Sequence, residues 1–78
     1  MERVWYGEAK MKYPKQWIIL VNMEDEPKTN KTFGDVYLVT PDEDEAYDKA
    51  IALGDSMGRR MVVEGFDDTP QIGGLWSL

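Results

Sequence analysis

Apolar residues in this chain form four strand-like runs and one helix-like stripe. From Arg3 to Tyr13 apolar and polar residues alternate, which predicts a strand with one buried face. Trp17 to Met23 is apolar on both faces, which predicts a central strand covered on both sides. The turn residues Tyr13-Pro14-Lys15 would join these two strands as a hairpin.

The most specific local signal is a change from strand to helix at residues 36–43. Val36-Tyr37-Leu38-Val39 is typical of a buried strand. Thr40, Pro41 and Glu43 then form a capping box with proline at the first helical position. We therefore predict a helix over about 41–53, ended by a glycine at position 54. Its apolar stripe consists of Ala46, Ala50, Leu53 and Met57, flanked by Tyr47 and Ile51.

Two further strands are predicted at 33–39 and 60–66, and the polar stretch at 24–32 is predicted to be an exposed, mobile loop. A strand, helix and strand in one sheet form a right-handed unit with parallel strands. The expected fold is therefore a single α+β domain over residues 1–78. It has a four-stranded, mainly antiparallel sheet with one helix on one face, in the order strand, strand, strand, helix, strand, and a short apolar carboxy-terminal tail.

This fold leaves one face of the sheet without a cover. A helix of about 13 residues is roughly 20 Å long and 10 Å wide, so it covers only one face of four strands. Either the tail or a second subunit would have to cover the other face. The candidate contact residues are Trp17, Leu75, Trp76 and Leu78.

Composition reduces the chemistry that the chain could perform. The sequence has no cysteine and no histidine, so it lacks a thiolate nucleophile, a thiolate zinc site and the usual general base at neutral pH. Carboxylates in the first turn of a helix or in turns already have a structural explanation, because they bind free amide groups. We therefore expect no cofactor, no metal site and no catalytic residue.

The formal charge of −6 is unevenly distributed along the chain. Residues 1–39 contain six basic and six acidic side chains, whereas residues 40–78 contain three basic and nine acidic side chains. An acidic field repels phosphate groups, which argues against nucleic-acid and membrane binding. No secretory signal and no run of about 20 apolar residues is visible, so we expect a cytoplasmic protein.

The leading hypothesis is a small, non-enzymatic interaction or accessory module that forms a homodimer or docks on a protein partner. One alternative is an acidic decoy that occupies a basic, nucleic-acid-binding groove. The acidic surface for this role comprises Asp42, Glu43, Asp44, Glu45, Asp48, Asp55, Asp67 and Asp68. A second alternative is a small enzyme that uses carboxylates, which predicts a deep pocket with a carboxyl group of raised pKa.

Overall fold

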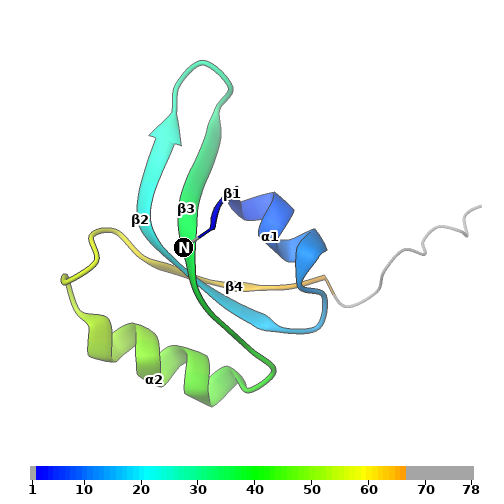
Figure 1. Ribbon diagram of the computed structural model, residues 1–78, viewed down its shortest axis with the longest axis vertical. Coiled ribbons are helices and arrows are strands. Elements are labelled where there is room, and N and C mark those ends of the chain that lie inside the picture. Colours follow the sequence, from blue (N-terminus) through cyan, green and yellow to red (C-terminus); the bar gives the residue numbers. More distant parts are fainter. Residues whose placement is uncertain (1, 67–78) are drawn as a thin grey trace, which may run out of the picture.

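The fold is an antiparallel four-stranded sheet with two helices, which confirms the predicted α+β class (Figure 1). The computed structural model describes residues 2–66. The elements are β1 (Arg3–Trp5), α1 (Tyr6–Lys12), β2 (Trp17–Glu26), β3 (Lys31–Thr40), α2 (Glu43–Leu53) and β4 (Met61–Glu64). The strands lie in the order β1-β3-β2-β4, so β2 and β3 are central and β1 and β4 are at the edges.

The predicted hairpin between the first two strands is wrong. β2 instead pairs with β3, in a long hairpin that projects from the rest of the molecule (Figure 1). Most of the predicted polar loop at 24–32 belongs to these strands, since Glu24 pairs with Phe33 and Glu26 with Lys31. Only residues 27–30 form the turn. This end of the hairpin extends beyond the core. Among residues 2–66 its strands therefore bury no face, and polar residues can form them.

The predicted strand from Arg3 to Tyr13 is also wrong beyond Trp5, because helix α1 begins at Tyr6. The same residues carry a helical period, and Ala9 at its centre is fully buried. Gly7 permits the close contact that opens this helix. A Cβ atom there would lie 2.8 Å from the Trp5 ring, closer than atoms in contact can lie.

Each face of the sheet is covered by a helix of the same chain. The α1 side holds a cluster of Val4, Ala9, Ile18, Leu20, Met23 and Val63. The α2 side holds a cluster of Ile19, Val21, Ala46 and Ala50, with Leu53 and Met57 packed against it. Successive residues of β2 therefore alternate between two buried faces, as predicted for a central strand. The expectation of an uncovered sheet face is wrong, because α1 lies where the sequence predicted a strand.

For the strand–helix–strand unit in the second half of the chain, the predicted parallel direction of the two strands is confirmed. β3 and β4 both pair antiparallel with β2, so they run parallel to each other with β2 between them. Helix α2 packs against all three of these strands. Strand β4 is shorter than predicted and ends at Glu64.

Helix α2 begins two residues later than predicted, with Asp42 rather than Thr40 as its amino-terminal cap. The Asp42 carboxylate accepts hydrogen bonds from the backbone N–H groups of Asp44 (3.0 Å) and Glu45 (3.4 Å). The buried Thr40 hydroxyl donates to the Glu45 carboxylate at 2.7 Å. At the other end, Arg60 donates to the carbonyl groups of Ala50 and Gly54, at 2.6 and 2.8 Å.

Candidate functional site

The predicted contact residues are only partly within the described residues. Trp17 lies on the α2 side of β2 and is half-buried. Its ring packs at a tilt of 56° against the ring of Tyr47, with centroids 6.0 Å apart. Trp17 therefore packs beneath Tyr47, on the side of α2 that faces the sheet. Leu75, Trp76 and Leu78 lie outside the described residues, and their role stays a prediction.

The predicted acidic surface is found on α2 and its two ends. Its described members are all exposed: Asp42, Glu43, Asp44, Glu45, Asp48 and Asp55. Asp67 and Asp68 lie outside the described residues. Within residues 2–66 the ion pairs join Arg3, Lys12 and Arg59 to acidic residues of the amino-terminal half. The carboxylates of α2 thus face solvent without a basic partner among residues 2–66.

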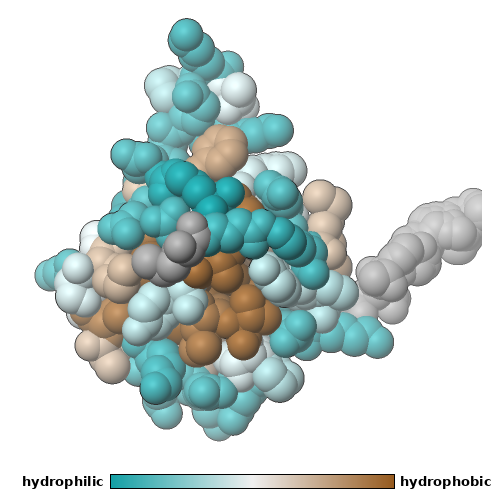
Figure 2. Space-filling view, viewed as in Figure 1, coloured by the Kyte–Doolittle hydropathy of each residue, from teal (hydrophilic) through white to brown (hydrophobic). Residues whose placement is uncertain are grey.

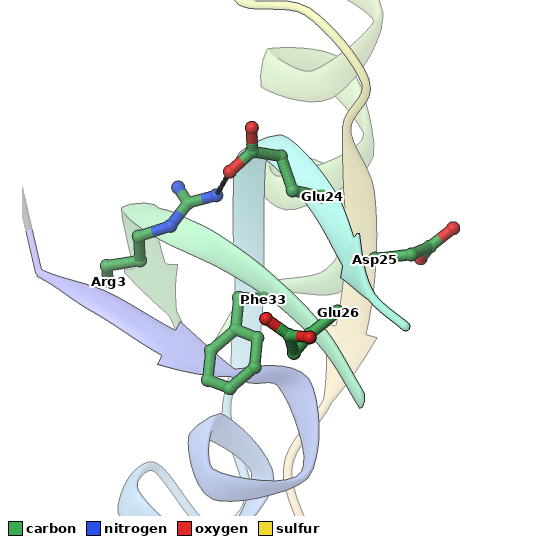
Figure 3. A pocket seen from close by; sticks show the side chains of 5 residues that line it. All are labelled: Arg3, Glu24, Asp25, Glu26 and Phe33. Atoms are coloured by element: carbon green, nitrogen blue, oxygen red, sulfur yellow. Dashed lines mark hydrogen bonds and ion pairs between the residues drawn. The ribbon is translucent and has the colours of Figure 1, made fainter. Parts of the chain in front are cut away.

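An open groove of about 510 Å³ lies beside the β2–β3 hairpin. It is lined by Arg3, Glu24, Asp25, Glu26 and Phe33 (Figure 3). The polar groups of this groove already have partners in the protein. Glu24 accepts from Arg3, and Glu26 accepts from the backbone N–H of Lys28 at 2.9 Å. In the close-up, Asp25 points away from the Arg3 side of the groove.

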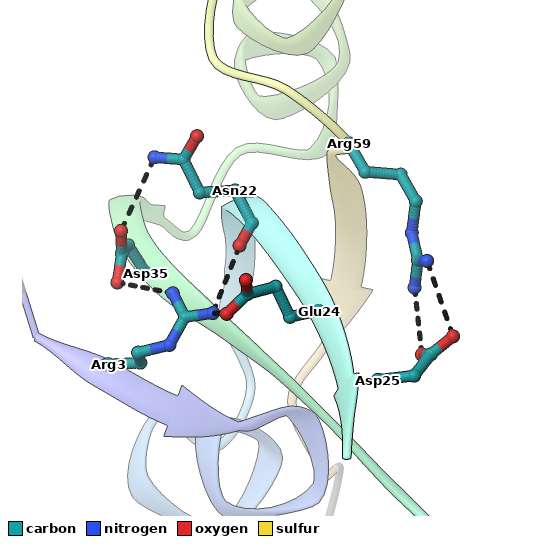
Figure 4. Close-up of polar contacts among 6 residues, drawn as sticks. All are labelled: Arg3, Asn22, Glu24, Asp25, Asp35 and Arg59. Carbon is teal, nitrogen blue, oxygen red and sulfur yellow. Dashed lines mark hydrogen bonds and ion pairs between the residues drawn. The ribbon is translucent and has the colours of Figure 1, made fainter. Parts of the chain in front are cut away.

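Two arginines hold the carboxylates around this hairpin in place (Figure 4). Arg3 donates to Glu24 at 2.6 Å, to Asp35 at 3.0 Å and to the Asn22 carbonyl at 3.2 Å. Arg59 forms an ion pair with Asp25 at 3.1 Å. These arginines connect β1, β2, β3 and the segment before β4, so the network has a structural role.

The same contacts lower the pKa of the carboxyl groups. The hydrogen bond from Arg3 lowers the pKa of Asp35, and the hydrogen bond from Arg59 lowers the pKa of Asp25. The hydrogen bond from Lys12 lowers the pKa of Glu2. A carboxylate-based enzyme needs a shift in the opposite direction, with at least one raised carboxyl pKa. These three carboxylates give that alternative no support.

Exposed apolar side chains lie on the flank of α2 that faces β4. Residues 45 and 47 project to opposite sides of a helix, because successive residues are about 100° apart. Glu45 is bonded to Thr40 at the end of β3, so Tyr47 and, one turn later, Ile51 lie on the β4 side. Tyr47 is 45% exposed and Ile51 is 70% exposed. Figure 2 shows hydrophobic atoms between the sheet and α2, with hydrophilic atoms on the hairpin and outer side of α2.

The outer edge of β4 is open among residues 2–66, because β4 is the last strand of the sheet. The Gly65 N–H donates to the Gln16 carbonyl at 2.8 Å, and Val63 pairs with Ile18. Alternate residues of an antiparallel strand bond to the same neighbour. The backbone N–H and C=O groups of Val62 and Glu64 therefore point away from the sheet.

We call this region the β4-edge surface: the outward backbone groups of Val62 and Glu64, with the side chains of Tyr47, Ile51 and Met61. Met61 lies on the α1 side of the sheet, opposite Leu20, and is 40% exposed. The open edge thus has exposed apolar side chains on both sides. The sequence predicted Tyr47 and Ile51 to flank the buried stripe of the helix. They are exposed because, among residues 2–66, the sheet ends at β4 and no further strand lies beneath them.

In comparisons with known proteins, the chain matches no family model, no curated protein and no solved structure. Within residues 2–66 no helix is long and apolar enough to span a membrane, and no three potential metal ligands lie close enough to hold an ion.

Proposed function

We propose that this protein is a non-enzymatic interaction module that docks on a protein chain through its β4-edge surface. The observation that carries this proposal is the coincidence of an open strand edge with exposed apolar side chains on both sides of it. Ile51, at 70% exposure, is the most exposed large hydrophobic residue within residues 2–66. Its position next to the outer edge of β4, which is open among residues 2–66, distinguishes it from a solitary surface residue.

Both parts of the surface favour association physically. An open edge offers a row of backbone donors and acceptors to an added strand, a common mode of peptide recognition. Burial of one large aliphatic side chain contributes about 1.5 to 3 kcal/mol. Tyrosine is enriched in interfaces because it combines apolar area with a polar end. Within residues 2–66 a helix covers each face of the sheet, so the β4-edge surface takes the place of the uncovered face expected from the sequence.

The composition supports a non-enzymatic role, since the chain lacks histidine and cysteine throughout. The carboxylate-based enzyme stays a hypothesis without a supporting observation. A cytoplasmic location likewise stays a prediction.

The acidic surface favours a second candidate function, a decoy for a basic groove. Its support is that the acidic residues of α2 have no ion pair within residues 2–66. Binding through these charges would weaken steeply with added salt, because exposed charges are screened beyond about 10 Å at 0.1 M. Binding through the β4-edge surface would depend little on salt.

Site-specific photo-crosslinking in cells of the source organism tests the proposed docking surface. A photoreactive amino acid replaces Ile51, and a matched control replaces Met11, which is 60% exposed on α1. We expect covalent adducts, with the chain itself or with another protein, at position 51 and not at position 11. Adducts at position 51 should decrease when Met61→Asp is added on the opposite side of the edge. Equal yields at the two positions would overturn the proposal.

A further inference from the structure

Building on the proposed function, we infer that the occupant of the β4-edge surface is a second copy of this chain. The two β4 strands pair antiparallel about a two-fold axis at Val63, and the two sheets become one continuous sheet. The inference rests on how well the edge complements itself in this register.

The backbone of β4 is self-complementary when Val63 faces its own copy. In this register Val62 lies opposite Glu64 of the second copy, and Glu64 lies opposite Val62 of the second copy. These two residues are the ones whose backbone groups point outward. Residues directly opposite each other in such a pair exchange both their N–H···O=C bonds. All outward groups of the described strand are thereby satisfied.

The side chains on the α2 side include opposite charges in the same register. Glu64 has Val62 of the second copy as its direct neighbour, and its diagonal neighbours are Arg60 and Glu64 of the second copy. Two Glu64–Arg60 pairs therefore outnumber the one Glu64–Glu64 pair at the two-fold axis. Diagonal cross-strand pairs remain within reach of long side chains, and opposite charges there are favourable. Arg60 is bonded to the carboxy-terminal end of α2, so its side chain is on this side of the sheet.

On the α1 side, Met61 lies opposite Gly65 of the second copy. Gly65 has no side chain of its own, but the backbone carbonyl group of Tyr13 fills the position where one would lie. Met61 would therefore pack against the Tyr13 backbone of the second copy, and an unbranched thioether adapts easily to such a surface.

The spacing of the helices also agrees with a second copy. Helix α2 packs on β3, β2 and β4, so its axis lies near β2. With strands about 4.8 Å apart, β2 is about 7 Å from the two-fold axis, and the two α2 helices are about 14 Å apart. Helices in direct contact are 8 to 10 Å apart, so a gap about one side chain wide remains. Tyr47 and Ile51 of both copies face this gap.

Sedimentation of the purified, full-length chain tests this inference. We expect a monomer–dimer equilibrium between about 1 μM and 1 mM total protein. Val62→Pro removes an outward N–H group at an edge position where proline is tolerated. Ile51→Asp places a charge in the apolar gap. Each variant should weaken the dimer at least tenfold, whereas the matched control Met11→Asp should leave it unchanged. Added salt should not weaken the dimer, because each copy carries a charge of −6 and their repulsion is screened.

Three outcomes would overturn the inference. The first is a monomer over the whole concentration range, as expected if the chain's own carboxy-terminal segment occupies the edge. The second is a dimer that both variants leave intact, because its interface would lie elsewhere. If Val62→Pro fails to fold, as judged by circular dichroism, Ile51→Asp decides alone. The third is a monomer that crosslinks through position 51 to a different protein, which would keep the proposed function and exclude the second copy.

Discussion

Two buried glycines illustrate how single residues specify this fold. A Cβ atom on Gly65 would collide with the backbone carbonyl oxygen of Tyr13, and one on Gly34 would collide with the sulfur atom of Met23. The two obstacles differ in kind. The carbonyl group belongs to the backbone that leads into β2, whereas the thioether can rotate. The chain therefore tolerates a methyl group less at position 65 than at position 34.

We expect Gly65→Ala to lower the free energy of unfolding by about 2 kcal/mol or more. Overpacked positions typically lose about 1 to 3 kcal/mol. Gly34→Ala should have a smaller effect, because the Met23 side chain can move. Urea denaturation of the two variants measures the difference. An equal loss of stability in both variants would show that the rigidity of the Tyr13 backbone is unimportant.

The identities of the buried residues were largely predictable at this scale. The stripe of Ala46 and Ala50 on the helix and the two-sided burial of the Ile18–Leu20 segment follow from periodicity alone. The exposure of Ile51 does not, because a flanking position is buried or exposed according to how far the sheet extends beneath it.

At the scale of elements, the start of α2 shows two candidate caps competing for the same helix. The sequence favoured Thr40, but the Asp42 carboxylate binds the free N–H groups while the Thr40 hydroxyl bonds to Glu45. An aspartate two residues later serves the first turn as well as a threonine does, and its charge interacts favourably with the helix dipole.

We expect Asp42→Ala to destabilise the protein by about 1 kcal/mol, the usual effect of a lost amino-terminal cap. Asp48→Ala is the matched control, because Asp48 is exposed in the middle of α2 and has no ion pair within residues 2–66. Thermal denaturation followed by circular dichroism compares the two. If both variants melt like the unchanged protein, Asp42 does not stabilise the helix.

The elements of the second half were predictable because their local signals agree with one another. A buried strand, a capped acidic turn and an apolar stripe all indicate the strand–helix–strand unit at 36–64. In the first half the signals conflict. Residues 3–13 fit a period of two and a helical period, and Ala9 and Gly7 permit the close packing of a short helix on the sheet. Packing against the sheet, rather than local propensity, decides for α1.

For the molecule as a whole, the ion pairs make stability depend on pH at the acidic end. The pKa of Asp35 lies below its ordinary value of 3.8 because Arg3 donates to it, and Arg59 acts in the same way on Asp25. A group with a lowered folded-state pKa stabilises the fold above its ordinary pKa. This contribution is lost as the pH falls below about 4 and through the folded-state pKa.

We expect Asp35→Asn to reduce the difference in unfolding midpoint between about pH 7 and pH 2.5, because the variant has already lost the titrating group. Asp48→Asn should keep the full difference. Urea denaturation at the two pH values provides the measurement. An unchanged pH dependence in Asp35→Asn would mean that the contact with Arg3 does not contribute to stability.

The candidate surface itself could not be predicted from the sequence. An open strand edge is a property of strand order, and the order β1-β3-β2-β4 depends on contacts between residues far apart in the chain. The sequence did indicate an interaction module, but on the basis of a bare sheet face that α1 covers. The β4-edge surface includes Tyr47, Ile51 and Met61, none of which was among the predicted contacts.

The position of β2 between β3 and β4 also bears on how the protein forms during synthesis. Ile18 meets its β3 partner Val39 after 21 further residues, but its β4 partner Val63 only after 45. While the ribosome extends the chain, the apolar strand β2 therefore has no neighbour on its β4 side until translation is well past α2. Such late pairing slows folding and leaves an aggregation-prone intermediate. Released chains that end before residue 61 should be bound by chaperones more readily than the full-length chain.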